Sequence, residues 1–237
     1  MFGQYNNTFE LKSDGLNIAV IKEDNLFRYK RITANETVNK VLAVNECSIL
    51  INPVEPLNTP KKISSHLMIA FNAPLLLEPK MTKKIYVKFP IEFGVFLTKG
   101  EIGGNEILDI FTLAKNKFTL YGDIKDGVIC KYYKSDIFSS IPKCNPIYEG
   151  VIELDVINKT GRYVSITKVI FNSFGMKIYY NKDLVSLKAN MTILGADAAE
   201  VDLENVSIQS GMKKSFEVYL LKMMSITGTK FMMEWGL

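Results

Sequence analysis

The chain has 237 residues, of which 47% are hydrophobic and 23% are charged, a composition typical of folded proteins and unlike that of disordered chains. Its 29 basic and 25 acidic residues give a formal net charge of +4, and only Arg28, Arg31 and Arg162 are arginines. Nucleic-acid binders usually carry a basic stripe and many guanidinium groups, so this dispersed, arginine-poor charge argues against a nucleic-acid partner.

Targeting and cysteine signals are sparse. Residues 1–30 contain no basic start followed by an apolar stretch, and no segment approaches the roughly 18 apolar residues of a membrane-spanning helix. We therefore expect a cytoplasmic protein without a membrane span. Cys47, Cys130 and Cys144 are widely spaced, and His66 is the single histidine, so the sequence predicts no disulfide framework, no metal site and no cofactor.

Alternating apolar and polar residues separated by turn residues predict strands throughout the first part of the chain. The predicted strands are residues 8–11, 16–22, 26–32, 64–71, 84–89, 92–98, 107–113, 117–121 and 128–133. Residues 35–50 fit either a short helix or two strands, because their apolar residues match both periods.

Three prolines fall within eight positions of the string Ile51-Asn-Pro-Val-Glu-Pro-Leu-Asn-Thr-Pro60. Proline lacks a backbone donor, so this string cannot form a central strand. It is interpreted as a crossover between sheets, in preference to a rigid binding edge that displays Glu55. Residues 135–146, which include Pro142 and Pro146, interrupt the strand pattern and predict a boundary between domains 1–146 and 147–237.

The C-terminal domain is predicted to be an immunoglobulin-like sandwich of about seven strands. These strands are residues 152–156, 162–168, 176–180, 184–194, 199–208, 215–222 and 230–235. The first two are expected to form a hairpin that turns at residues 158–161. A phase slip in the fifth predicts a β-bulge near Glu204 and Asn205.

His66 lies in an apolar run of strand character. A catalytic serine–histidine arrangement would be supported by a Gly-x-Ser-x-Gly elbow, which the sequence lacks. We expect a packed histidine at a strand face or strand end. The string Gly100-Glu-Ile-Gly-Gly-Asn105 lacks the Gly-Lys-Ser/Thr ending of a phosphate-binding loop, so a hairpin loop is expected there.

Glu200, Asp202 and Glu204 share one strand face and could bind a cation if loops supplied further oxygens. The calcium-loop pattern is absent, so a solvated face that pairs with Lys213 and Lys214 is expected. Aromatic residues gather at 89–96, 132–133 and 179–180. They are expected in the core, although an exposed cluster could stack on sugar or peptide.

Several strings resemble a known family. They are the proline string, Ile91-Glu-Phe-Gly-Val95, Leu120-Tyr-Gly-Asp123 and Gly127-Val-Ile-Cys-Lys-Tyr-Tyr133. Together they are similar to the archaeal domain-of-unknown-function family four hundred and thirty-two, over most of the chain. The resemblance implies an archaeal, cytoplasmic protein and supplies no catalytic residues.

The sequence therefore predicts an all-β chain of two consecutive β-sandwich-like domains. No catalytic, cofactor-binding or metal residues are assigned. The expected function is that of a non-catalytic scaffold or adaptor that binds another protein or a copy of itself. The alternative is a carbohydrate-binding or hydrolytic protein that uses carboxylates such as Glu92 or Asp109 in a cleft between the domains.

Overall fold

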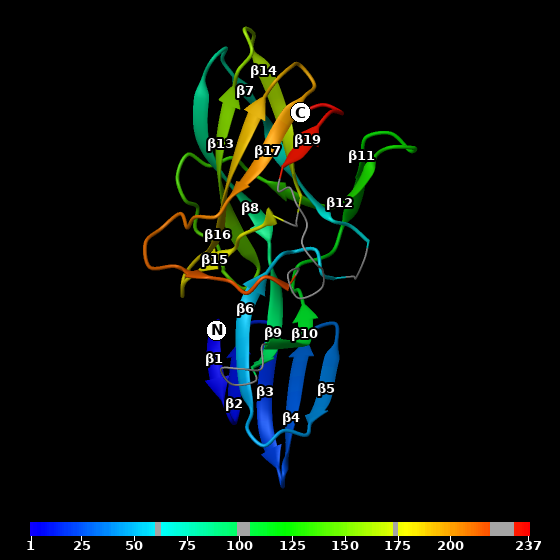
Figure 1. Cartoon of the computed structure of the whole chain (residues 1–237), viewed down its shortest axis with the longest axis vertical. Helices are drawn as coiled ribbons and strands as arrows, with labels where there is room; N and C mark the ends of the chain where they lie inside the picture. Colours follow the sequence, from blue (N-terminus) through cyan, green and yellow to red (C-terminus); the bar gives the residue numbers. More distant parts are fainter. Residues whose placement is uncertain (60–62, 99–104, 173–174, 219–229) are drawn as a thin grey trace. The chain divides into compact units, whose positions relative to one another are not determined.

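The computed structural model describes residues 1–59, 63–98, 105–172, 175–218 and 230–237 (Figure 1). These residues form nineteen strands in four sheets, which confirms the predicted all-β class. Within the described ranges, no helix has the length and apolar character needed to cross a membrane. The chain divides into two compact units, which are described separately: unit 1 is Met1–Asn52 with Phe93–Leu113, and unit 2 is Pro53–Glu92 with Ala114–Leu237.

Unit 1 contains two four-stranded sheets. Sheet A has the order β1 (Gly3–Asn6), β6 (Ser48–Val54), β9 (Glu92–Thr98) and β10 (Asn105–Phe111). Sheet B has the order β2 (Phe9–Ser13), β3 (Leu16–Glu23), β4 (Leu26–Thr33) and β5 (Thr37–Leu42). Residues 35–50, for which helix and strand were both open, thus contribute β5 and the start of β6.

The core of unit 1 follows from strand alternation. In β3, Leu16, Ile18 and Val20 are buried while the residues between them are more exposed. In β6, Ile49 and Ile51 are fully buried in the same way. Successive side chains of a strand point to opposite faces, so each sheet has one apolar face, and burying these faces accounts for a sandwich.

Unit 2 holds the other two sheets. Sheet C has the order β11 (Phe118–Tyr121), β12 (Val128–Ser135), β7 (His66–Leu77) and β14 (Val164–Asn172). Sheet D runs β18 (Lys213–Lys214), β15 (Tyr179–Tyr180), β16 (Val185–Ile193), β13 (Glu149–Asn158) and β8 (Thr82–Pro90). From β16, sheet D continues through β17 (Ala199–Glu204) to β19 (Phe231–Met233).

Sheets C and D contact each other through β7 and β12 against β8, and through β14 against β17. Strand β13 is paired on both sides, antiparallel with β8 and parallel with β16. Its apolar residues Val151, Ile152, Leu154 and Val156 are all fully buried. In the sequence these apolar residues alternate with Glu153 and Asp155, and this alternation explains why the strand was predicted correctly.

The hairpin expected at residues 152–168 is wrong, because β13 lies in sheet D and β14 pairs with β7 in sheet C. Asn158 holds the connection between them. Its buried side chain donates to the carbonyl oxygens of Glu78 at 2.8 Å and Arg162 at 3.0 Å, and accepts from the Thr160 amide at 2.9 Å. The polar segment therefore anchors a change of sheet.

The β-bulge expected near Glu204 and Asn205 is also wrong. Strand β17 pairs with β16 in unbroken register from Ala199 to Glu204 and ends there. The apparent phase slip reflects the end of the strand. The predicted strand at residues 176–180 is reduced to β15. The strand predicted at 215–222 is wrong for residues 215–218, which are not in a strand, and its residues 219–222 lie outside the described residues.

The proline string was expected to avoid a central strand, but its first residues, up to Val54, belong to β6, an inner strand of sheet A. Pairing with β1 ends at Ile51, so Pro53 falls where no bond to β1 is lost. The chain passes from unit 1 to unit 2 after Asn52, in line with a crossover. Glu55 is buried and is not displayed.

The compact units differ from the predicted division at residue 146, which falls inside unit 2. The reason is pairing across that position, since β13 forms a nine-residue ladder with β8 from Glu149–Pro90 to Ile157–Thr82. Unit 1 is likewise assembled from two separate stretches of chain. The immunoglobulin-like description of the C-terminal strands stays a prediction.

Candidate functional site

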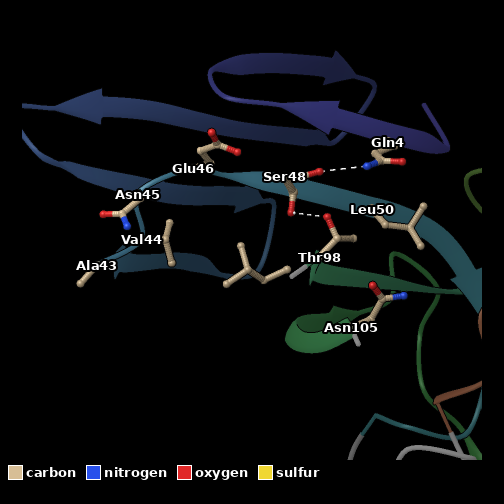
Figure 2. A pocket seen from close by; sticks show the side chains of 10 residues that line it. Gln4, Ala43, Val44, Asn45, Glu46, Ser48, Leu50, Thr98 and Asn105 are labelled. Atoms are coloured by element: carbon tan, nitrogen blue, oxygen red, sulfur yellow. Dashed lines mark hydrogen bonds between the residues drawn. The ribbon is translucent and has the colours of Figure 1, made fainter. Parts of the chain in front are cut away.

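A hollow of about 760 Å³ on sheet A is the candidate functional site of unit 1 (Figure 2). The segment before β6 and all four strands of the sheet supply its lining, which consists of Gln4, Ala43, Val44, Asn45, Glu46, Ser48, Leu50, Leu97, Thr98 and Asn105. The alternation of β6 explains its composition. Because Ile49 and Ile51 point into the core, Ser48 and Leu50 must point outward into the hollow.

Ser48 is the centre of a hydrogen-bond network in the hollow. Its hydroxyl accepts from Nε2 of Gln4 at 3.0 Å and donates to Oδ1 of Asn6 at 2.8 Å. The Thr98 hydroxyl donates to the Ser48 carbonyl at 3.1 Å, and Figure 2 shows the bonds to Gln4 and Thr98. These bonds fix the positions of neutral donors and acceptors across β1, β6 and β9.

The described lining of the hollow is mostly uncharged. Amides and hydroxyls dominate its polar lining, Leu50 and Leu97 are apolar, and Glu46 is the only ionisable side chain among the lining residues that the structure describes. The described part of its lining includes no aromatic side chain on which a sugar ring could stack. Amides and hydroxyls can both donate to and accept from a peptide backbone, and the apolar groups can receive its side chains.

Glu92, one of the two carboxylates considered for hydrolysis, is fully buried in unit 2. Lys131 donates to its Oε1 at 2.6 Å, and the Thr59 hydroxyl donates to the same oxygen at 2.8 Å. The Asn58 amide donates to Oε2 at 2.9 Å. The carboxylate thus ties β9 and β12 to the proline string, and its oxygens are engaged by the protein.

Asp109, the second carboxylate considered, is buried in unit 1. Its Oδ2 accepts from Nε of Arg31 at 2.7 Å and from the Tyr29 hydroxyl at 2.9 Å. Burial, reinforced by the nearby Asp109 charge, raises the pKa of Tyr29 far above its ordinary value, so this hydroxyl remains a donor. Glu92 and Asp109 belong to different units, and each is held by groups of its own unit.

His66 begins β7 and is half-buried, in agreement with the expected strand-end position. Its Nδ1 lies 3.1 Å from the Ser65 hydroxyl, and its ring packs 4.8 Å from that of Phe231. Burial lowers the pKa of His66 below its ordinary value. Apolar packing thus favours the neutral imidazole.

The acidic row on β17 pairs differently from the expectation. Glu200 binds Lys230 at 2.5 Å, and Glu204 binds Lys188 at 3.1 Å, because β19 and β16 flank β17. Lys214 instead binds Glu217 at 3.0 Å. Among the residues that the structure describes, no group of three His, Cys, Asp or Glu side chains could hold a metal ion.

The aromatic residues were expected in the core, and Phe89, Phe93, Phe96 and Tyr180 are buried there, whereas the other tyrosines of these clusters are half-buried. The expected hairpin loop at residues 100–105 lies outside the described residues except for Asn105.

All three cysteines are free thiols, as expected from their spacing. Burial raises the pKa of Cys130 to about 12 and also raises that of Cys47 and Cys144. Neither the hollow nor the Lys131–Glu92 pair was predicted from the sequence. A usable signal for the hollow was the alternation of uncharged polar residues with buried ones in β1 and β6. The ion pair joins residues 39 positions apart and has no local signal.

Comparison with known proteins gives one match. No curated protein and no solved structure matches the chain. The model of a family described as a protein of unknown function (DUF432) matches residues 1–234, which is nearly the whole sequence and includes both units. The chain therefore belongs to the DUF432 family.

Proposed function

We propose that the chain is a non-catalytic interaction protein that binds an extended, uncharged peptide segment of a partner in the hollow of sheet A. The observation that supports this proposal is the mostly uncharged lining that the described residues give the hollow, in which fixed amides and hydroxyls lie beside Leu50 and Leu97. Extended segments recognised by backbone bonds need this mixture of polar groups and side-chain pockets.

The state of the candidate carboxylates also favours binding over hydrolysis. A glycosidase needs two carboxyl groups that face the same bond, one of them as an acid. Glu92 and Asp109 each accept hydrogen bonds from a cationic side chain in a buried site. The proposal includes a cytoplasmic location, which the three free thiols support because reducing compartments keep cysteines unpaired.

Selection of a library of random peptides on the intact chain tests this function. Peptides enriched on the wild type should be uncharged, with apolar side chains at alternate positions. Their affinity should fall at least about tenfold, or about 1.4 kcal/mol, on a Leu50→Lys variant, because an ammonium group would occupy the apolar part of the hollow.

Val41→Lys is the matched control, since Val41 is an exposed apolar strand residue of unit 1 outside the hollow, and this variant should bind as the wild type does. Circular dichroism would verify that both variants are folded. The proposal fails if no peptide is enriched over background, or if Leu50→Lys binds the selected peptides as well as the wild type does.

A further inference from the structure

Strand β11 is an edge of sheet C whose exposed residues are unusually apolar. It pairs with β12, and Figure 1 draws the two as a hairpin. The side chains of Phe118 and Leu120 are 36% and 42% exposed. Ile129, which lies opposite Leu120 on β12, is 50% exposed. Edge strands are commonly protected by charged residues or proline, and β11 contains neither.

The register shows which backbone groups of β11 face outward. The Tyr132 amide donates to the Lys117 carbonyl at 2.8 Å, so residues 117 and 132 form a hydrogen-bonded pair of the antiparallel ladder. Such pairs alternate along a ladder, so Thr119 and Tyr121 also bond to β12. The N–H and C=O groups of Phe118 and Leu120 therefore point away from the sheet.

Within the described part of the chain, no strand pairs with this outer edge. We propose that β11 is a self-association edge, where two copies of the chain pair their β11 strands antiparallel about a two-fold axis through Thr119. This surface belongs to unit 2 and is independent of the peptide site proposed on sheet A.

Backbone pairing in this register is self-complementary. Phe118 of one copy faces Leu120 of the other, and the two residues exchange two backbone N–H···O=C hydrogen bonds. The two-fold axis repeats this pair, so the interface contains four such bonds. A register shifted by one residue is excluded, because it would place the outward backbone groups of Phe118 and Leu120 opposite residues whose own groups already bond to β12. The exposed Phe118 and Leu120 side chains then cover one another across the interface.

Charge complementarity supports a second copy as the partner. Exposed Lys115 and Lys117 precede β11, and exposed Asp123 follows it. An antiparallel partner with the same sequence places Asp123 of the second copy opposite Lys115 and diagonal to Lys117. The two-fold axis generates this attraction twice, whereas a parallel arrangement would set like charges side by side.

Sedimentation of the full chain tests the proposal. The wild type should be a dimer, and Leu120→Lys should weaken dimerisation by at least about thirtyfold, since both Phe118–Leu120 contacts are lost and two ammonium groups enter the interface. Val41→Lys, an exposed apolar position in unit 1, should remain dimeric. A monomeric wild type at high micromolar concentration, or a dimer unaffected by Leu120→Lys, would overturn the proposal.

Disulfide trapping tests the register in a Cys144→Ser background. Thr119→Cys should form an intermolecular disulfide under mild oxidation, because the Cα atoms of this non-hydrogen-bonded pair would lie about 4.5 Å apart, within the disulfide range. Ile124→Cys should not, although Ile124 is 94% exposed, since it lies away from the axis. Cross-linking of Ile124→Cys without that of Thr119→Cys would contradict this register.

Discussion

At the residue scale, the most consequential feature is the buried ion pair between Lys131 and Glu92. Their side chains are 1% and 0% exposed, and Thr59 and Asn58 complete the hydrogen bonds of the carboxylate. Burying both charges has a high desolvation free energy. The attraction between the two ions and their hydrogen bonds offset it only while both side chains are present. The pair therefore makes the fold of unit 2 sensitive to either residue.

Lys131→Met should lower the free energy of unfolding by about 3–5 kcal/mol, because it leaves the Glu92 carboxylate buried without its counter-charge. The double variant Glu92→Met/Lys131→Met should recover much of this loss, since no uncompensated charge remains. Urea unfolding of the three proteins measures both effects. A Lys131→Met variant as stable as the wild type would contradict the account of Glu92.

His66 should make stability depend on pH. Its pKa is lowered in the folded chain from 6.5, so the unfolded chain binds the proton first as the pH falls. Stability is therefore present above the ordinary histidine pKa and is lost as the pH falls below it. The free energy of unfolding of the wild type should decline relative to that of His66→Gln between about pH 7.5 and pH 5. A difference that stays constant over this range would exclude the effect.

Residue partners were the least predictable part of the molecule. The sequence identified Glu92 and Asp109 as notable carboxylates, yet it could not show that Lys131 and Arg31 neutralise them. These contacts depend on strand pairing between distant segments, whereas sequence patterns report local periodicity. For the same reason, the acidic residues of β17 were predicted to pair with Lys213 and Lys214, whereas Glu200 and Glu204 pair with Lys230 and Lys188.

At the element scale, strand positions were predictable because alternation and turn residues are local. The predicted strands at residues 16–22, 92–98 and 184–194 correspond closely to β3, β9 and β16. Pairing was not predictable in the same way. The sequence pattern around Asn158 predicts a hairpin turn. In the structure, the Asn158 side chain donates to the carbonyl oxygens of Glu78 and Arg162 and stabilises the connection between two different sheets.

Gly150 in β13 is required by close packing. A Cβ atom at this position would lie 2.6 Å from Cζ of the buried Phe89 ring, its cross-strand partner, and 3.0 Å from the Val185 carbonyl oxygen. Gly150→Ala should therefore destabilise the chain by about 1–3 kcal/mol through overpacking.

Gly161→Ala provides the control, because a Cβ atom there meets nothing within 4 Å. Its melting temperature should equal or slightly exceed that of the wild type, since alanine restricts the unfolded chain more than glycine does. Equal melting temperatures for Gly150→Ala and Gly161→Ala would contradict the packing described around β13.

At the scale of the whole molecule, the two compact units are interleaved in the sequence. Unit 1 is formed by Met1–Asn52 and Phe93–Leu113, and unit 2 by the remaining stretches. The sequence placed a boundary at residue 146 because Pro142 and Pro146 interrupt a strand pattern. Local composition indicates a break between strands, but it cannot show that the next strand pairs with β8.

A fragment of residues 147–237 should therefore not fold alone. It lacks β8, the antiparallel neighbour of β13, and β7, the neighbour of β14. The exposed edges and apolar faces would favour an unfolded or aggregated chain. Amide proton spectra of the fragment should show the narrow dispersion of an unfolded protein, and a well-dispersed spectrum would contradict this division into units.

The central claim is that sheet A of unit 1 binds an extended peptide segment. Titrating the isotope-labelled chain with the selected peptide tests it directly by amide chemical shifts. We expect the largest shifts at Gln4, Ser48, Leu50, Thr98 and Asn105, which line the hollow. Shifts confined to residues outside sheet A, or a spectrum unchanged by excess peptide, would contradict it.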